Sequence, residues 1–307
     1  MPDHLLNRSC PLCEQNKAKR LFGKGSLQLV QCEGCSMIYA DPIEPRFASG
    51  QFYDQRGISF YLSRNKLESD HAAVRFEREL RIFRAYCPSG SVLDVGCSTG
   101  AFLLSLKSTS PADYSVFGTD VVSAALDYAE SHGVRILRKS FLDLADENLL
   151  FDAITFWAVM EHLVEPRKFL RQAASLLKPG GLCFVLVPNM NSLAVRVLGA
   201  KYRYIMPEHL NYFTPSTLRK FVEGCPEFVV ANLTSTHFNP IVILKDLRGG
   251  TGLVPDSERA ELLKRTTGWK QNPWLRPVKS LYSMAESALA AYNLADNLVI
   301  VLRKKVR

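Results

Sequence analysis

The sequence predicts an α/β chain built around a parallel sheet, and three observations support this fold class. Apolar runs of strand length alternate with helical apolar patterns between about residue 90 and residue 190. A glycine turn at residues 96–100 joins the first run to a helix. The second run ends in an acidic residue, Asp120. Such alternation gives a sheet with helices on both faces and a ligand site at the carboxyl ends of its strands.

The first unit is a strand at residues 92–95, a turn containing Gly96 and Gly100, and a helix at residues 101–107. Glycines in this turn let a ligand approach backbone that a Cβ would block. The helix at residues 215–223 is expected to begin after Thr214 as its N-cap. Further strands are predicted at residues 114–120, 134–137, 151–157, 182–189, 228–236 and 297–302, and further helices at residues 66–86, 124–129 and 169–177, the last stopped by a turn at residues 178–181.

Length and composition are those of an ordinary globular protein. The chain has 307 residues, of which 47% are hydrophobic and 22% are charged. No apolar run reaches the ~18 residues that a transmembrane helix needs. The N-terminus lacks the long apolar centre of a signal peptide. We therefore expect a cytoplasmic protein.

The net charge of +8 is concentrated at the C-terminal end. Residues 241–307 carry 12 Lys and Arg against 6 Asp and Glu, whereas residues 66–240 carry 18 of each. A basic end favours phosphate-bearing partners or peripheral contact with an anionic membrane surface. A solvated basic face is an equally simple interpretation.

Four of the eight cysteines form two Cys-x-x-Cys pairs near the N-terminus. Cys10 and Cys13 are separated by 18 residues from Cys32 and Cys35. Each pair can present two thiolates from one tight turn, and four thiolates complete a closed tetrahedral zinc site. The spacing, with strands expected at residues 27–31 and 37–39, predicts a zinc ribbon over residues 1–45. With no open coordination position, this Zn²⁺ should be structural.

Four segments of the alternating region carry a family resemblance. They are Asp94-x-Gly96-x-x-x-Gly100, Gly118-Thr119-Asp120, residues 157–163 and residues 177–181. In this order they resemble the class I S-adenosylmethionine-dependent methyltransferases, whose sheet is Rossmann-like. The four cysteines and the segment Glu208–Phe213 resemble a subgroup that places a zinc ribbon ahead of this fold, which includes sugar C-methyltransferases.

The resemblance implies a set of cofactor-binding residues. Asp94, Gly96, Cys97 and Gly100 would line the methionine and ribose end of S-adenosylmethionine, and Asp120 would bind the ribose hydroxyls with Val121 beside it. The remaining assignments are Leu142 and Asp143 at the adenine and Trp157 over the cofactor. Ser98 replaces a common glycine, which a sulfonium cofactor tolerates because it brings no pyrophosphate to the turn.

Methyl transfer from a sulfonium needs alignment of the acceptor and removal of a proton. His209, with Glu208 beside it, follows the fifth strand of the sheet, and His162, with Glu161 beside it, follows the fourth. Histidine suits proton removal near neutral pH. The resemblance favours His209 as the base. Alternatively, His162 holds a loop and His209 only packs against Tyr212.

The acceptor class is narrowed by what the fourth strand lacks. Base-amino methyltransferases usually carry an (Asp/Asn)-Pro-Pro-(Tyr/Phe) motif there, whereas this chain reads Phe156-Trp157-Ala158-Val159. No cysteine nucleophile for pyrimidine carbon is present in that loop. The expected acceptor is an oxygen or activated carbon of a sugar or related small molecule, which can be nucleotide-linked.

About 60 residues separate the last two predicted strands, which are normally adjacent. We expect residues 241–294 to form a helical insertion or cap, with helices at residues 257–264 and 278–293. Residues 46–90 are then a linker with a leading helix, and residues 91–240 with 295–307 form the methyltransferase core. Trp269, Trp274 and Tyr282 lie among cations and could bind a nucleotide-sugar, lipid phosphate or nucleic acid, or form the core of the insertion.

Two alternative functions remain at this point. An RNA methyltransferase would use the ribbon to grip RNA, but the neutral block at residues 66–240 makes a nucleic-acid partner unexpected. A non-catalytic cofactor-binding scaffold is the other alternative. The intact set of Asp94, Gly96, Gly100 and Asp120 argues against it.

Overall fold

The structure is a computed structural model that describes residues 5–109, 113–144, 149–249, 253 and 276–306. Its centre is a seven-stranded sheet of order β10-β11-β8-β7-β4-β5-β6. Strands β6, β5, β4, β7 and β8 are parallel, and β11 is antiparallel to both β8 and β10. The strands are β4 (Gly90–Val95), β5 (Tyr114–Thr119), β6 (Arg135–Ile136), β7 (Phe151–Trp157), β8 (Leu177–Pro188), β10 (Phe228–Thr236) and β11 (Asn297–Lys304). The predicted α/β fold class is confirmed.

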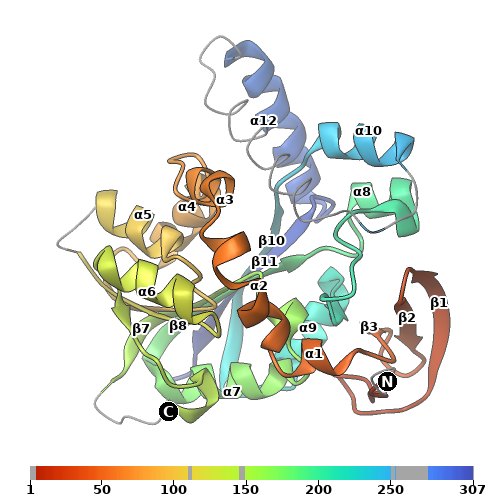
Figure 1. Cartoon of the computed structure of the whole chain (residues 1–307), viewed down its shortest axis with the longest axis horizontal. Helices are drawn as coiled ribbons and strands as arrows, with labels where there is room; N and C mark the ends of the chain where they lie inside the picture. Colours follow the sequence, from red (N-terminus) through yellow and green to blue (C-terminus); the bar gives the residue numbers. More distant parts are fainter. Residues whose placement is uncertain (1–4, 110–112, 145–148, 250–252, 254–275, 307) are drawn as a thin grey trace.

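Helices cover both faces of this sheet (Figure 1). One apolar cluster joins a face of the sheet to α4, α5 and α6, and another joins the opposite face to α7 and α9. These helices are α4 (Glu77–Tyr86), α5 (Ala101–Thr109), α6 (Ser123–Ser131), α7 (Pro166–Leu176) and α9 (Pro215–Glu223). Helix α9 begins as predicted, because Thr214 caps it and exchanges hydrogen bonds with Thr217.

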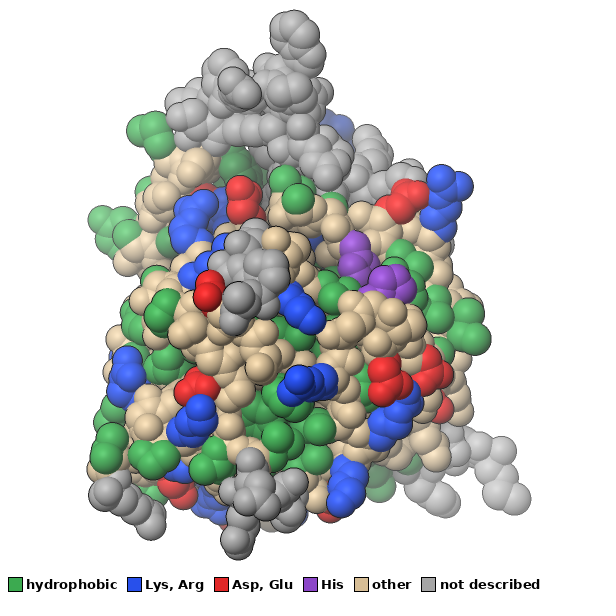
Figure 2. Space-filling view, turned by 90° about the vertical axis from the view of Figure 1, so that its left-hand side faces the viewer, with side chains coloured by type: hydrophobic (Ala, Val, Ile, Leu, Met, Phe, Trp, Pro, Cys, Tyr) green, Lys and Arg blue, Asp and Glu red, His purple; other side chains and the backbone are tan. Residues whose placement is uncertain are grey.

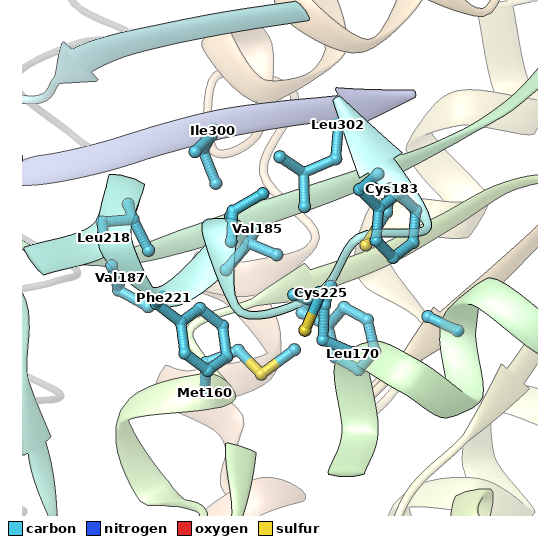
Figure 3. Packing of buried hydrophobic residues seen from close by; sticks show 14 of the residues in the cluster. Met160, Leu170, Cys183, Val185, Val187, Leu218, Phe221, Cys225, Ile300 and Leu302 are labelled. Atoms are coloured by element: carbon cyan, nitrogen blue, oxygen red, sulfur yellow. The ribbon is translucent and has the colours of Figure 1, made fainter. Parts of the chain in front are cut away.

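The core between β8, β11 and the helices α7 and α9 is apolar and closely packed (Figure 3). Alternate residues of β8 point to this face, as the period of a strand requires. They meet Leu170 of α7 and Phe221 of α9, both of which are buried. Met160, in the loop after β7, is fully buried in the same cluster. The core therefore holds the loop that follows β7 in place.

A second, four-stranded sheet has the order β1-β2-β3-β9. Its first three strands, β1 (Ala18–Lys24), β2 (Leu27–Cys32) and β3 (Ile38–Ala40), form the N-terminal ribbon. The fourth, β9 (Asn211–Tyr212), comes from the segment after β8 and pairs with β3. Apolar side chains of the ribbon also pack against Leu198, Ile205 and Leu210. The ribbon is thus built into the main body of the protein.

Short helices fill the space between the ribbon and the sheet. Helix α2 follows a left-handed Gly50 and bends at Gly57, where the backbone is not helical. These helices are α1 (Pro45–Ala48), α2 (Gln51–Tyr61), α3 (Arg64–Asp70) and α8 (Leu193–Leu198), with one-turn 3₁₀ helices at Phe141–Asp143, Met160–His162 and Gly199–Lys201. Figure 1 shows α2 between the ribbon and the α5–α6 side of the molecule.

Helix α10 (Pro240–Arg248) lies beside α8, and helix α12 (Arg276–Ala291) projects from the body at the top of Figure 1. Buried Arg203 pairs with Asp246 and ties α10 to the segment after α8. Arg78 of α4 pairs with Glu286 of α12. The expected helix at residues 257–264, Trp269 and Trp274 lie outside the described residues. In the part of the chain that is described, no helix has the length and apolar character to cross a bilayer.

Two predicted boundaries are wrong. The helix expected at residues 66–86 is two helices, α3 and α4, because the chain turns at residues 71–76 so that His71 reaches Thr99 (Nε2 to Oγ1, 3.1 Å). The turn expected at residues 178–181 is the start of β8. There the register with β7 slips between Phe151 and Ala153, and Gly180 takes a positive φ of 77°.

Charges of both signs are mixed on the face shown in Figure 2, which is the left side of Figure 1. Lys and Arg side chains are scattered among Asp and Glu there rather than gathered in one basic patch. Arg138, for example, pairs with Asp127 at 2.9 Å. The mixture of charges on this face agrees with the equal numbers of basic and acidic residues between positions 66 and 240.

Candidate active site

A large cavity opens at the carboxyl ends of β4, β5 and β7. Its volume is roughly 1180 Å³, which exceeds the range of about 300–1000 Å³ usual for a single small ligand. Side chains from α2, from the strand ends and from the segment before β9 line it. A cavity of this size at this edge can hold a nucleoside cofactor together with a second small molecule.

The glycine turn after β4 forms one wall. Gly96 has a φ of 76°, and a Cβ at this position would lie 2.6 Å from Val159 Cγ2. Ser98 also takes a left-handed φ of 49°, and its N–H donates to Asp120 Oδ2 at 2.8 Å. Gly100 has a different role: its added Cβ would meet Val134 at 2.9 Å, and Gly100 is not part of the cavity lining. Gly100 therefore serves the packing of α5 on its neighbours.

Two carboxyl groups line the cavity, the buried Asp94 and the half-buried Asp120. Asp94 accepts a hydrogen bond from Thr155 Oγ1 at 2.6 Å, and Asp120 accepts from the N–H groups of Ser98 and Val122. Burial raises the pKa of Asp94 to about 7, and the nearby charge of Asp120 adds to this rise. Burial also raises the pKa of Asp120. Two neighbouring carboxyl groups whose pKa values are both raised are matched to a cationic ligand.

Most of the other predicted cofactor residues reach the cavity. Cys97, Val121, Leu142 and Trp157 line it together with Asp94, Gly96 and Asp120. Trp157 packs edge-on against Phe102 at 5.1 Å between ring centroids. Asp143, by contrast, is exposed and does not line the cavity, because the 3₁₀ turn at Phe141–Asp143 directs it to the surface.

The two predicted histidines meet in the lining of the same cavity. The rings of His162 and His209 lie 4.7 Å apart and nearly perpendicular, and both are part of the lining. His162 Nδ1 lies 2.8 Å from the carbonyl oxygen of Glu208 and 2.6 Å from the hydroxyl of Tyr53. Burial lowers the pKa of His162, which favours a neutral imidazole. The two sequence segments that carry candidate bases thus form one cluster.

The two glutamates beside these histidines differ in environment. Glu208 lies 3.5 Å from the guanidinium of Arg56, which comes from α2. Glu161 is 1% exposed, and neither of its carboxylate oxygens has a hydrogen-bond partner among the described residues. Burial raises the pKa of Glu161 to about 8. Glu161 is therefore a buried acid in the cavity lining whose two carboxyl oxygens accept no hydrogen bond from the described residues.

Sequence reasoning missed several residues of this wall. Tyr53 and Arg56 lie in residues 46–90, which the sequence predicts as a linker with a leading helix and which carry no recognisable catalytic motif. His237 also lines the cavity, and its Nε2 lies 2.5 Å from Glu79 Oε1. Asp296, at the start of β11, is also part of the lining. The sequence indicates a segment with helical parts ahead of the sheet, but it does not reveal which side chains of α2 face the cavity.

The four N-terminal cysteines come together as the spacing predicts. Cys10 Sγ lies 3.4 Å from Cys35 Sγ, and Cys13 Sγ lies 3.4 Å from Cys32 Sγ. All four sulfur atoms lie within 4.8 Å of one another. Thiolates around a tetrahedral zinc ion, with Zn–S bonds of about 2.3 Å, are spaced at roughly 3.8 Å. The donor set and its geometry fit a structural zinc ion.

Comparison with known proteins agrees with this geometry. A family described as a methyltransferase domain matches residues 69–224, just over half of the chain. The chain belongs to this methyltransferase family. It is accordingly an S-adenosylmethionine-dependent methyltransferase, and the matched residues run from α3 to the end of α9.

Two curated relatives of this methyltransferase are named as ubiquinone biosynthesis O-methyltransferases. The protein from Caulobacter vibrioides is 32% identical over 174 residues, which cover 51% of this chain and 66% of that protein. The protein from Bradyrhizobium diazoefficiens is 31% identical over 210 residues, which cover 62% of this chain and 81% of that protein. The first match spans about two thirds of its relative's length.

Solved structures show that the fold is shared. The cyclase SpnF has a TM-score of 0.54 at 16% identity, with 84% of this chain and 96% of that chain covered. A protein from Thermotoga maritima, described as an S-adenosylmethionine-dependent methyltransferase, has a TM-score of 0.52 at 15% identity, with 83% and 99% covered. At these identities the similarity concerns the fold alone.

Proposed function

We propose that this methyltransferase transfers the methyl group of S-adenosylmethionine to a hydroxyl oxygen of a small molecule, with a histidine as general base. The observation that carries the proposal is the shared cavity. Asp94 and Asp120 line it at the ends of β4 and β5, and His162 and His209 line it from the segments after β7 and before β9. An activated carbon acceptor would use the same arrangement, because it too must lose a proton.

The cofactor is assigned to the wall formed by β4, β5 and β7. Asp120 would accept hydrogen bonds from the ribose hydroxyls, and Asp94 would face the positively charged methionine end. Cys97, Val121, Leu142 and Trp157 would line the remainder. Gly96 would let the cofactor approach the backbone of the turn.

The acceptor is assigned to the wall formed by α2 and the segment before β9. Oxygen is preferred because the curated relatives are named as O-methyltransferases. The sugar class comes from the ribbon-first layout of the chain, and a sugar or related polyol remains our proposed substrate. His209 would take the hydroxyl proton, and Glu208, held by Arg56, would support it. His162 is the second candidate base.

We also propose that a zinc ion on Cys10, Cys13, Cys32 and Cys35 holds the ribbon of residues 1–45 together. Its effect would reach the active site through the sheet, since β3 pairs with β9 two residues after His209. The N–H of Ala40 donates to the Leu210 carbonyl at 3.0 Å, next to that histidine. The ribbon would thus position the proposed base.

The test combines cofactor binding with methyl transfer. Radiolabelled S-adenosylmethionine is offered with hydroxylated acceptors, including a catechol and nucleotide-linked sugars. We expect label in at least one oxygen acceptor. His209→Ala should lower kcat by about 10²–10⁴-fold, the usual contribution of a general base, with little change in cofactor affinity. His132→Ala is the matched control, because His132 is exposed and does not line the cavity.

Three results would contradict the proposal. The cofactor assignment fails if calorimetry detects no binding of S-adenosylmethionine. The oxygen assignment fails if the label enters only carbon or nitrogen. The assignment of the base fails if His209→Ala and His162→Ala both retain the turnover of His132→Ala.

A further inference from the structure

The acceptor wall contains a group of metal-ligand side chains that is separate from the cysteine cluster. Glu161, His162 and His209 each offer one ligand atom, and these three atoms lie within 4.8 Å of one another. Ligands of one ion with bonds of about 2.1 Å are separated by at most roughly 4.2 Å. Small rotations of the three side chains therefore bring them to coordination distance.

Glu161 provides an independent reason to expect a cation. Its side chain is 99% removed from solvent, and its two carboxylate oxygens have no hydrogen-bond partner among the described residues. A buried carboxylate without partners is costly, and burial is tolerated when the group pairs with a cation or coordinates a metal. The nearby Glu208 is already engaged by Arg56. Glu161 is thus the carboxylate that is available to an ion.

The surroundings of His162 favour the same role. Its Nδ1 lies 2.8 Å from the Glu208 carbonyl oxygen, which can only accept a hydrogen bond. The proton is then on Nδ1, and Nε2 carries the lone pair. A histidine that donates from one ring nitrogen to a carbonyl while the other nitrogen binds the ion is the usual arrangement around metals.

We propose that Glu161, His162 and His209 bind one divalent cation that holds and acidifies the acceptor hydroxyl. Two nitrogens and one carboxylate suit a first-row ion such as Zn²⁺ or Mn²⁺ better than Mg²⁺ or Ca²⁺, which prefer oxygen. Three protein ligands leave an open position toward the cavity. The proposal rests on the proposed oxygen acceptor and gives the two histidines a different task, as ligands instead of bases.

The proposed reaction needs only the acceptor, the cofactor, the bound cation and water. The acceptor hydroxyl binds the cation and releases its proton to water. The oxygen anion then attacks the methyl carbon of the cofactor, the carbon–sulfur bond breaks, and sulfur keeps the electron pair as a neutral thioether. The cation lowers the pKa of the bound hydroxyl as it does for bound water. The acceptor oxygen would fill the open position and be held in place for in-line attack.

The test counts zinc. The full chain is dialysed against buffered Zn²⁺ at low micromolar free concentration, and bound zinc per chain is measured. We expect two ions in the wild-type protein and in the surface control His132→Ala, and one ion in Glu161→Gln and in His209→Ala. One ion in the wild type, or two in Glu161→Gln, would overturn the proposal. Unchanged S-adenosylmethionine binding shows that each variant is folded.

Methyl transfer separates this proposal from the proposed function. Dialysis against a chelator that removes only the weaker ion should lower transfer at least tenfold, and added Mn²⁺ or Zn²⁺ should restore it. Full transfer by the one-zinc protein would overturn the cation site and leave the O-methyltransferase proposal standing. Failure to bind S-adenosylmethionine would instead count against the proposed function.

Discussion

The two walls of the cavity are built in different ways. The cofactor wall is formed by residues that are close in sequence. The turn after β4 and the end of β5 supply most of it, within some thirty residues. Asp94 and Gly118 are register partners on these neighbouring strands. The acceptor wall is assembled from distant segments. Tyr53 of α2 contacts His162, which is 109 residues away in sequence. His162 in turn contacts Glu208 across 46 residues.

The two walls also depend on different supports. Backbone hydrogen bonds to Asp120 hold the cofactor wall within its own strand–turn–helix unit. The acceptor wall is held from outside the sheet, by α2 and by the ribbon that pairs with β9. Cofactor binding should therefore survive changes in the ribbon that impair the acceptor chemistry.

The largest effect on the cofactor wall is expected from Asp120→Ala. The carboxylate both organises the turn through Ser98 and Val122 and is our proposed ribose ligand. Charge-assisted hydrogen bonds contribute about 1.5–3 kcal/mol each, so affinity for S-adenosylmethionine should fall about 100-fold. Calorimetry measures this, with the exposed Asp127→Ala as the control. Equal binding by both variants would contradict the assignment.

A second prediction concerns pH, and follows from the pKa of Asp94, which burial raises from 3.8 to about 7. Because the folded pKa is raised, the contribution of Asp94 to the stability of the cofactor-free protein is present below pH ~4 and is lost as pH rises through ~7. A cationic cofactor prefers the ionised carboxylate. Its affinity should therefore rise with pH, by up to about tenfold per unit below pH ~7, and then level off.

Proton release tests this linkage directly. Calorimetry at pH ~6.5 in two buffers of different ionisation enthalpy should show that binding of S-adenosylmethionine releases protons. Asp94→Asn should reduce the release, and any remainder belongs to Asp120, whose pKa is also raised by burial. No release from the wild type would show that Asp94 does not respond to the cofactor's charge.

The smallest effect is expected at Ser98. Its φ of 49° is a left-handed conformation, which disfavours residues other than glycine. Ser98→Gly should relieve this and stabilise the protein by roughly 0.5–1 kcal/mol, while the backbone hydrogen bond to Asp120 is kept. The control Ser131→Gly, at the exposed last residue of α6, should instead destabilise the protein, because glycine has a lower helix propensity than serine. Urea unfolding measures both, and a destabilised Ser98→Gly would show that the serine is preferred there.

The same contrast explains what the sequence could predict. Strand–turn–helix units and the cysteine pairs depend on short-range patterns, so β7 and α9 have the predicted bounds. The cluster of Tyr53, Glu161 and His162 depends on where α2 and the segment before β9 settle against the sheet. No local periodicity encodes such contacts. Gly100 and Asp143 were expected to contact the cofactor, but neither lines the cavity. The spacing of a motif does not show which of its residues face a cavity.

Arg8 offers the most direct test of the claim that the ribbon holds the acceptor wall. It precedes the first cysteine pair, and its guanidinium donates to the carbonyls of Leu210 (3.0 Å) and Val164 (2.9 Å). It also reaches Asn211 Oδ1 at 3.1 Å. These contacts join the N-terminal segment to both loops that carry the histidines.

The decisive measurement compares Arg8→Met with the wild type, for cofactor affinity and for kcat on the same sample. Methionine keeps much of the aliphatic volume and the backbone hydrogen bond to Asp41, but removes every hydrogen bond that the guanidinium donates. The account predicts an affinity for S-adenosylmethionine within about twofold of wild type and a kcat at least tenfold lower, since misplacement of about 1 Å can cost 10²-fold. An unchanged kcat, or a parallel loss of affinity and kcat, would contradict the separation of the two walls.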